Sequence, residues 1–563
     1  MNGTIPILIP APHRFRFLLP ALLLAGLSGQ PQPTFSSAAR LVEINVTALD
    51  AKGAPVPTLT ASHLTLTDNG KPRPIAFFRY EGQAALDPPK ARLPLNFFSN
   101  RIEYSGGPPR NVTVLLLDSL NTEPGDQLMV KAQAMQFLKQ LAPRTRVAVY
   151  HLGPKFRIIH EFTADTESLR RQLARFQTGQ PSQRLSDIDV LATEFEQWLL
   201  ATGNNPQLAS GLEAALSGEQ HFNTTARRTR VAQTLGRLEE ISRHIQGIPG
   251  RKNIVWITGG IAMYSARPPV RGSATERQRM NPFVGEDFEK DINATARRLA
   301  QAGIVLYAVD ARGLFSGAEN FASLQDMPAL NGRYAEIQQT AALSADTRSA
   351  LGALTGATGG RLLFNTNDFT EGIRRAANDQ LGAYSLAFYA DAEPDGKWHA
   401  LKLSSSLPGL RLSYRQGYLA GGSAPPAQPQ EQLRAALLSP LGASAIRITA
   451  HCVPAASAGD LVLTALIDPA DIAFTANQDR RSASFEVTIG ELSPQGEVRF
   501  QQSAVRLNLT AAQSAAIREK GIPFRQTLRP APTTHALRIL VQQCETGLSG
   551  TLDIPLKEIR ILP

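Results

Sequence analysis

Three short runs of almost continuous apolar residues constrain the fold of this chain more than any other feature. They cover residues 112–117, 254–257 and 304–309, and each ends at a polar or glycine-rich segment. Runs of this kind are typical of strands that are buried on both faces of a parallel sheet. Apolar residues at helical spacing recur between them, as at 225–246 and 288–299. The repeated strand–helix–strand order predicts an α/β fold, a doubly wound mostly parallel sheet with helices on both faces.

The boundaries of this α/β domain follow from the same pattern. We place the domain at residues 110–392, with the strand-like run 384–389 as its last strand. Polar and irregular stretches at 177–224 and 313–342 interrupt the pattern and are interpreted as insertions. We expect these insertions to shape the surface at the edge of the sheet.

Segments with period-two alternation flank the α/β domain and predict β modules around it. A small N-terminal β module is expected at 40–82, and a β hairpin at 395–420. Because each is too small to be stable alone, we expect the two to pack together. The segment 83–109 contains Pro and Gly, has no clear period and is interpreted as a linker.

The C-terminal part of the chain predicts a separate β domain. A stretch of Gly, Pro, Ala and Gln at 421–432 is interpreted as a second linker. Beyond it, at 433–563, six or seven short alternating segments punctuated by turn residues predict a β-sandwich. The two cysteines, Cys452 and Cys544, both lie here. After export they either form a disulfide or remain two separate thiols.

The N-terminal segment has the order of an export signal. Arg14 and Arg16 precede the apolar run 17–27, and the small residues Ser28 and Gly29 follow it. Residues 1–29 therefore predict a secretory signal peptide, with a signal anchor or a buried helix as the alternatives. The run has about 11 residues, which is too short to span a bilayer. We expect a secreted, periplasmic or cell-envelope protein without a transmembrane span in the mature chain.

The charge of the chain does not indicate a nucleic-acid partner. The formal net charge is +10, but short basic pairs such as Arg227-Arg228 and Arg480-Arg481 are scattered among acidic and apolar neighbours. A scattered basic surface without an RNA- or DNA-binding motif is typical of an ordinary solvated surface.

Polar residues follow each of the three apolar runs, at Asp118, Thr258 and Asp310. In parallel sheets, ligands bind outside the carboxyl ends of the strands. We therefore predict a partner-binding rim at this edge. Its residues are Asp118, Ser119, Asn121, Thr122, Thr258 and Asp310.

Four stretches, spread over about residues 40–420, carry a family resemblance. They lie at 46–53 together with 66–72, at 115–122, at 354–368, and at 395–418. In this order they resemble the VWFA-related proteins first grouped in Acidobacteria. The resemblance implies that the α/β domain is von Willebrand factor A-like, and the C-terminal β-sandwich lies outside it.

The resemblance also implies a degenerate metal-dependent adhesion site. In metal-binding A domains the first strand ends in D-x-S-x-S, whose oxygen atoms suit Mg²⁺ or Ca²⁺. Asp118 and Thr122 match the first and last positions, but Leu120 takes the middle one. Thr258 matches a later position, and Gly259 stands where an Asp usually follows. For the third loop, either Thr224 or Thr225 is the candidate.

Asp118 and Thr122 are thus the two candidate metal ligands, with Mg²⁺ or Ca²⁺ as the possible ion and no other cofactor expected. The alternative is that Asp118 caps the turn that follows it and Thr122 satisfies backbone donors nearby.

No sequence motif of a known catalytic site is present. The chain has no HExxH, Walker loop or GxGxxG, and its nine His are dispersed. We therefore expect a protein that is not an enzyme. The leading hypothesis is an exported protein-interaction or adhesion-type scaffold with a protein partner of unknown identity. The alternatives are a hydrolase of unknown substrate that uses the same sheet edge, and a purely structural envelope component.

Overall fold

The described part of the chain belongs to one compact unit, residues 39–563. A computed structural model describes residues 40–81, 93–101, 104, 112–122, 124–141, 145–177, 206–248, 250–261, 288–311, 346–364, 382–390, 397–420, 429–477, 480–495 and 497–560. The expected signal peptide at 1–29 and the expected insertion at 313–342 lie outside the described residues.

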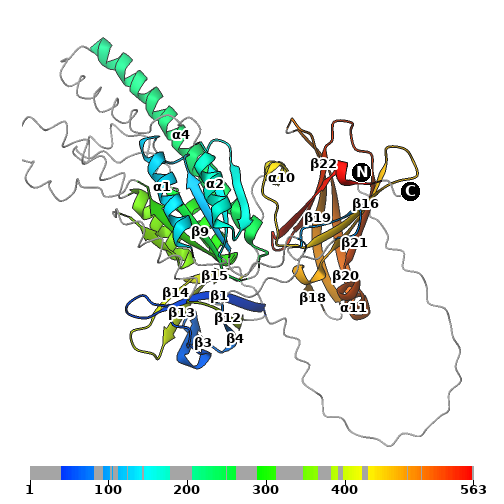
Figure 1. Cartoon of the computed structure of the whole chain (residues 1–563), viewed down its shortest axis with the longest axis horizontal. Coiled ribbons are helices and arrows are strands. Elements are labelled where there is room, and N and C mark those ends of the chain that lie inside the picture. Colours follow the sequence, from blue (N-terminus) through cyan, green and yellow to red (C-terminus); the bar gives the residue numbers. More distant parts are fainter. Residues whose placement is uncertain are drawn as a thin grey trace, which may run out of the picture. The chain divides into compact units, whose positions relative to one another are not determined.

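A six-stranded sheet lies at the centre of the α/β part (Figure 1). Its strands, in spatial order, are β11 (Arg361–Leu363), β10 (Ile304–Asp310), β9 (Lys252–Thr258), β6 (Val112–Asp118), β7 (Arg146–Leu152) and β8 (Arg157–Thr163). Neighbours pair parallel except for β7 and β8, which pair antiparallel. The three apolar runs of the sequence, in β6, β9 and β10, are therefore adjacent and parallel, as predicted.

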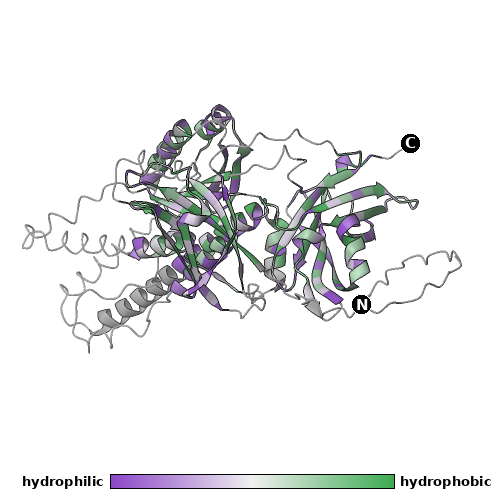
Figure 2. Cartoon of the chain, turned by 90° about the horizontal axis from the view of Figure 1, so that it is seen from below, coloured by the Kyte–Doolittle hydropathy of each residue, from purple (hydrophilic) through white to green (hydrophobic). Residues whose placement is uncertain are grey.

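Helices cover both faces of this sheet because side chains alternate between the faces along each strand. On one face, Leu115 and Leu117 of β6 pack in a core with α1 (Pro124–Gln140) and α2 (Thr166–Arg175). On the other, Val114 and Leu116 pack with α4 (Pro206–Ile245), α6 (Glu289–Gln301) and the helix at 346–358. The apolar residues concentrate on the strands between these layers (Figure 2).

Helix α4 begins earlier than the sequence pattern predicts. We expected a helix from 225 and an irregular insertion at 177–224, but α4 begins at Pro206 and runs for 40 residues. Proline suits the first position of a helix because the amide hydrogen missing there has no intrahelical partner anyway. Within the described residues, no helix combines the length and apolarity needed to cross a membrane.

The N-terminal β module and the hairpin after the α/β part form one β unit. One sheet has the order β14 (Arg411–Tyr414), β1 (Arg40–Leu49), β12 (Ala383–Ala390), β4 (Ile75–Tyr80). The other has the order β15 (Gly417–Leu419), β13 (Trp398–Ser405), β2 (Leu64–Asp68), β3 (Lys71–Arg73). All of these pairs are antiparallel, and both sheets contribute side chains to one core.

Strand β12 corrects our placement of 384–389 as the last strand of the α/β domain. It pairs with β1 and β4 in the β unit. The reason for the error is physical. Residues 383–388 are buried on both faces of their sheet, so their sequence reads like that of a central parallel strand. Among the described residues, the other sheets are all antiparallel, so the chain is a mixed α/β protein whose central sheet is mostly parallel.

Two buried arginines connect the β unit to the edge of the central sheet where its strands begin. Arg251, 1% exposed, donates to Thr47 Oγ1 at 2.5 Å and to Tyr307 Oη at 2.8 Å. Arg415 donates to the carbonyl oxygens of Ala300, at 3.1 Å, and Glu43, at 2.6 Å. Because buried cations need partners, these bonds fix the β unit against the amino-terminal edge of the sheet.

The C-terminal part is built from two further groups of antiparallel strands that share an apolar core. The first has the order β21 (Ile522–Leu528), β17 (Leu461–Ile467), β16 (Ile448–Pro454), β5 (Phe97–Ser99). The second has the order β18 (Thr475–Asn477), β19 (Arg480–Leu492), β22 (Ala536–Gln543), β23 (Ser549–Pro555), and β20 (Val498–Thr510) also pairs with β19. Cys452 is buried and Cys544 is exposed, and both are free thiols, so the possible disulfide is not formed.

Two segments that we interpreted as linkers contain regular structure. Helix α10 (Pro429–Leu438) overlaps the expected linker 421–432. Strand β5 lies within the expected linker 83–109 and supplies an edge strand of the sandwich. A three-residue strand has no periodicity to detect, and its partner β16 is about 350 residues away in the sequence. Nothing local in the sequence indicates this pairing.

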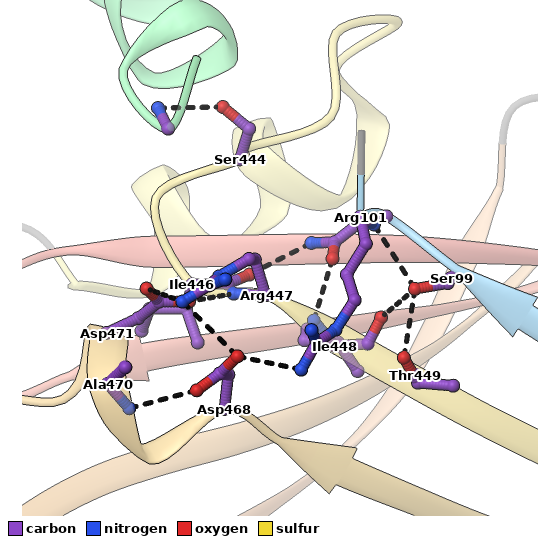
Figure 3. Close-up of polar contacts among 12 residues, drawn as sticks. Ser99, Arg101, Ser444, Ile446, Arg447, Ile448, Thr449, Asp468, Ala470 and Asp471 are labelled. Carbon is purple, nitrogen blue, oxygen red and sulfur yellow. Dashed lines mark hydrogen bonds and ion pairs between the residues drawn. The ribbon is translucent and has the colours of Figure 1, made fainter. Parts of the chain in front are cut away.

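Side chains beside β5 hold it to β16 (Figure 3). Asn100 accepts from Ile448 N at 2.7 Å and donates to the carbonyl oxygen of Ile446 at 2.9 Å. Arg101 forms an ion pair with Asp468 at 2.7 Å. The chain therefore passes through the sandwich before it enters the central sheet.

Replacing Asn100 with alanine tests the role of β5 in the sandwich. The change removes two partly buried hydrogen bonds and leaves their backbone partners unsatisfied, so we expect it to lower the free energy of unfolding by about 2 kcal/mol. Urea denaturation of the full chain measures the effect. The matched control is Asn508→Ala, which removes an exposed bond to Arg480 and is expected to cost less than about 0.5 kcal/mol. Equal stability of the two variants would contradict the role of β5.

Candidate functional site

Asp118 ends β6 at the point where the strand order of the central sheet reverses. Strand β7 lies on one side of β6, and β9, which follows later in the chain, lies on the other. In open α/β sheets this switch point is where ligands bind. The Asp118 side chain is nevertheless only 1% exposed.

Five donors surround the Asp118 carboxylate. Oδ1 accepts from the backbone amides of Leu120 and Asn121, both at 2.9 Å. Oδ2 accepts from Asn121 Nδ2 at 2.8 Å, Trp256 Nε1 at 3.0 Å and Thr258 Oγ1 at 2.7 Å. Burial raises the pKa of Asp118, and these hydrogen bonds oppose that shift because they stabilise the ionised form.

Local sequence explains how these donors meet. Trp256 and Thr258 are two residues apart on β9, so both point to the same face of the sheet as Asp118. The amides of Leu120 and Asn121 turn back to the carboxylate two and three residues earlier, as in turns capped by aspartate. We named capping of the following turn as the alternative role of Asp118. These two backbone hydrogen bonds are such a cap, so the alternative accounts for part of the environment of Asp118.

The residues present do not fit a magnesium or calcium ion. A carboxylate offers about four lone-pair directions, and the five donors occupy those of Asp118. Thr122 Oγ1 accepts from the amide of Gly259 at 2.9 Å. Leu120, at the middle position, is a buried apolar residue. In the described part of the chain, no three His, Cys, Asp or Glu side chains gather as metal ligands would.

Gly259 shows that the missing aspartate could not be accommodated. A Cβ atom at this residue would lie 2.5 Å from the carbonyl oxygen of Asn121 and 3.1 Å from Thr122 Cα. The two strand-end loops are thus packed too closely for any side chain between them. Asp118 and Thr122, our candidate metal ligands, serve to join the loops instead.

Thr234 of α4 is a site residue that the sequence analysis missed. Its Oγ1 accepts from Asn121 Nδ2 at 2.9 Å and donates to the carbonyl oxygen of Arg230 at 2.8 Å. Thr224 and Thr225, the candidates for the third loop, lie earlier within the same helix. The signal that could have identified Thr234 is its position between Val231 and Leu238, where a polar residue interrupts an apolar stripe.

Arg230 lies one helical turn before Thr234 and brings a positive charge to the rim. Burial lowers the pKa of Arg230, the negative charge of Asp118 opposes that shift, and the neighbouring Arg227 adds to it. Its side chain is partly exposed, and it forms no hydrogen bond or ion pair with the residues that the structure describes. The sequence analysis did not single out this residue, because only the fold brings α4 to Asp118.

Ser119 points to the opposite face of the sheet from Asp118. Its Oγ lies 2.6 Å from Nε2 of His151, a residue of β7 that is 4% exposed. His151 Nδ1 is buried and has no partner. A pocket of about 260 Å³, including the solvent at its mouth, adjoins the pair. Its lining includes Leu117, Gln127, Val130, Lys131 and Phe176.

Five of the six predicted rim residues therefore lie together on one side of the switch point. Asn121 and Thr258 both donate to the Asp118 carboxylate, and Thr122 joins the same two loops by accepting from the amide of Gly259. Asp310 is the neighbour of Thr258 in the β9–β10 pairing. Ser119 is adjacent but turned to the α1 face, with His151.

Exposed apolar residues border the rim on the α1 side. Leu128 is 78% exposed and Met129 is 49% exposed, and both lie in the first turns of α1, directly after the loop at 119–122. Single exposed apolar residues are ordinary on protein surfaces, and these two are adjacent near the carboxyl-terminal edge of the sheet.

Comparisons with known proteins identify only distant likenesses. No family model matches the chain, and no curated protein matches it. One similar solved structure is an aerotolerance-related membrane protein from Bacteroides fragilis NCTC 9343, with 13% identity, a TM-score of 0.23, and coverage of 48% of this chain and 98% of that one. A von Willebrand factor type A protein from Catenulispora acidiphila has 7% identity, a TM-score of 0.24, and coverage of 69% and 75%.

A third similar structure is the pilus adhesin SpaC from Lactobacillus rhamnosus GG, with 8% identity, a TM-score of 0.24, and coverage of 77% of this chain and 53% of that one. These comparisons give no support to the narrower, acidobacterial part of the sequence resemblance. At such TM-scores the likeness carries no weight in the functional argument, which rests on the geometry of the rim.

Replacing Asp118 with asparagine tests the role of the five donors around its carboxylate, which we call the donor cage. The amide nitrogen of asparagine accepts no hydrogen bond, so buried donors lose their partner, and we expect the free energy of unfolding to fall by at least about 3 kcal/mol. Urea denaturation followed by tryptophan fluorescence measures the change. Addition of EDTA or millimolar MgCl₂ should leave the wild-type transition where it is. If magnesium stabilised the wild type but not the variant, the Asp118 carboxylate would be a metal ligand, and the donor cage would be contradicted.

His151 predicts a specific dependence of stability on pH. Burial, with a smaller contribution from Arg157, lowers the pKa of His151 from 6.5 to about 4. Between about pH 6.5 and pH 4, His151 is therefore protonated in the unfolded chain but neutral in the folded chain. The free energy of unfolding falls as the pH drops through this interval. Between pH 7 and pH 5 the loss is about 2 kcal/mol.

The measurement compares urea denaturation of the wild type and His151→Gln at pH 7 and pH 5. Other titrating groups contribute to both proteins, so the wild type should lose about 2 kcal/mol more than the variant over this interval. Equal losses would show that the pKa of His151 is the same in the folded and the unfolded chain, and would contradict the shift.

Proposed function

We propose that this chain is an exported interaction protein whose α/β part is a doubly wound, von Willebrand factor A-like domain. It binds a protein partner at the rim around Asp118, and it does so without a metal ion. The observation that carries the proposal is the donor cage, the five donors around the Asp118 carboxylate: among the described residues, the switch point of the sheet holds hydrogen-bonded loops with neither a metal site nor a complete catalytic set.

The two edges of the central sheet support this assignment in different ways. The β unit packs against the amino-terminal edge through Arg251 and Arg415. The carboxyl-terminal edge presents the rim, with the exposed Leu128 and Met129 on one side and the cationic Arg230 on the other. Exposed apolar side chains and an accessible arginine are both features that protein interfaces favour.

A second candidate function, hydrolysis, has one observation in its favour, the Ser119–His151 pair. A serine within hydrogen-bond reach of a neutral histidine is the core of an activated nucleophile. Two features weigh against it. His151 Nδ1 has no group to orient it, and the amides of Ser119 and Leu120 both donate to the carbonyl oxygen of Leu152, so neither is free to stabilise an oxyanion. We therefore favour binding over catalysis.

Site-specific photocrosslinking in cells that export the chain tests the binding function. A benzoylphenylalanine at Leu128, beside the rim, is expected to give a discrete adduct with a partner. The matched control places the same residue at Phe500, which is 40% exposed on β20 of the sandwich. EDTA should not change the adduct. The absence of any adduct from Leu128, or equal adducts from both positions, would favour a purely structural role.

Labelling with a fluorophosphonate separates the hydrolase alternative. We expect no covalent labelling of the folded wild-type chain, because the Ser119 hydroxyl is nearly buried and its surroundings offer no oxyanion site. Intact mass spectrometry detects the adduct, with Ser119→Ala as the control. Labelling of the wild type that is lost in this variant would establish a reactive serine and contradict the binding-only proposal.

A further inference from the structure

We propose that Arg230 is the specificity residue of the rim and binds a carboxylate of an acidic segment in the protein partner. This inference rests on the proposed function of the rim and adds the chemistry that the partner must have. The positive charge that a metal ion would supply at this edge comes here from a side chain of α4.

The position of Arg230 is fixed by a hydrogen-bonded chain that leads back to the switch point. Asn121 donates to Asp118 and to Thr234, and the Thr234 hydroxyl donates to the backbone carbonyl of Arg230. Residues four apart lie on the same side of a helix, so Arg230 and Thr234 both face this edge of the sheet. The arginine therefore stands on a rigid element beside the rim rather than on a loop.

The guanidinium group of Arg230 is available to a ligand. It interacts electrostatically with Asp118, but the five donors already occupy the Asp118 carboxylate. No other acidic residue in the described ranges forms an ion pair with it. None of its nitrogen atoms is among the buried atoms without a partner, so solvent reaches them.

The guanidinium group of Arg230 suits a carboxylate ligand. Two charges act on it: the Asp118 carboxylate, which has the larger effect and attracts it, and Arg227, one turn earlier, which repels it. The planar guanidinium presents paired N–H groups that match a carboxylate with two parallel hydrogen bonds. Because Leu128 and Met129 are exposed at the same edge, the fitting partner is a protein segment with an Asp or Glu close to apolar residues.

Fluorescence anisotropy with two labelled peptides tests the charge requirement on the full chain. The probes are a decaglutamate and a decaglutamine, both in EDTA. We expect the wild type to bind decaglutamate more tightly than decaglutamine, and Arg230→Gln to weaken decaglutamate binding by about tenfold. The matched control, Arg411→Gln, removes an exposed arginine of β14 and should bind as the wild type does.

A conservative variant shows whether weaker binding comes from loss of the guanidinium group or from loss of the folded structure. Arg230→Lys keeps the charge but not the fork of donors, so its affinity should fall between those of the wild type and Arg230→Gln. The melting temperature of each variant is recorded in parallel. Wild-type affinity in Arg230→Gln, or dependence of decaglutamate binding on added Mg²⁺, would overturn the proposal.

Crosslinking from Leu128 then distinguishes this inference from the proposed function beneath it. If both hold, the partner adduct forms in the wild type and is lost in Arg230→Gln. If the adduct persists in Arg230→Gln, the rim binds a partner but Arg230 does not select it. If the wild type itself forms no adduct, the proposed binding function of the rim is contradicted, and with it the role of Arg230.

Discussion

Burial of the Asp118 charge is the constraint on which the organisation of this edge depends. A carboxylate removed from water is stable only when hydrogen bonds replace its hydration. Here the donors come from the turn after β6 and from β9, and Asn121 extends the network to α4. Satisfying one charge therefore positions three elements relative to one another. The same bonds leave the carboxylate no free lone pair for a metal ion.

The two edges of the central sheet consequently have different roles. At the amino-terminal edge, Arg251 donates to Thr47 of the β unit, and Arg415 of the β unit donates to the carbonyl oxygen of Ala300, so both buried cations hold the two parts together. At the carboxyl-terminal edge, Arg230 keeps its donors accessible. The difference between a structural and a ligand-binding arginine is the presence or absence of acceptors within the chain.

The sequence predicts those parts of the fold that depend on residues close to one another in the chain. Continuous apolar runs identify β6, β9 and β10, and Asp118 is identified as the polar residue that follows the first run and ends β6. What it cannot show is pairing between distant segments. Strand β12 has the composition of a central strand but lies in the β unit, and β5 joins the sandwich through β16. Thr234, Arg230 and His151 acquire their roles only because the fold brings other residues to them.

The central claim is that the switch point of the sheet is closed to metal ions by hydrogen bonds. Crystals of the full chain soaked in Mn²⁺ test this most directly, since anomalous scattering locates manganese without reference to any assumed site. The account predicts no anomalous peak at the rim and Asp118 oxygens bonded to nitrogen and hydroxyl donors. A peak within about 2.6 Å of an Asp118 oxygen, the range of metal–oxygen bonds, would contradict it.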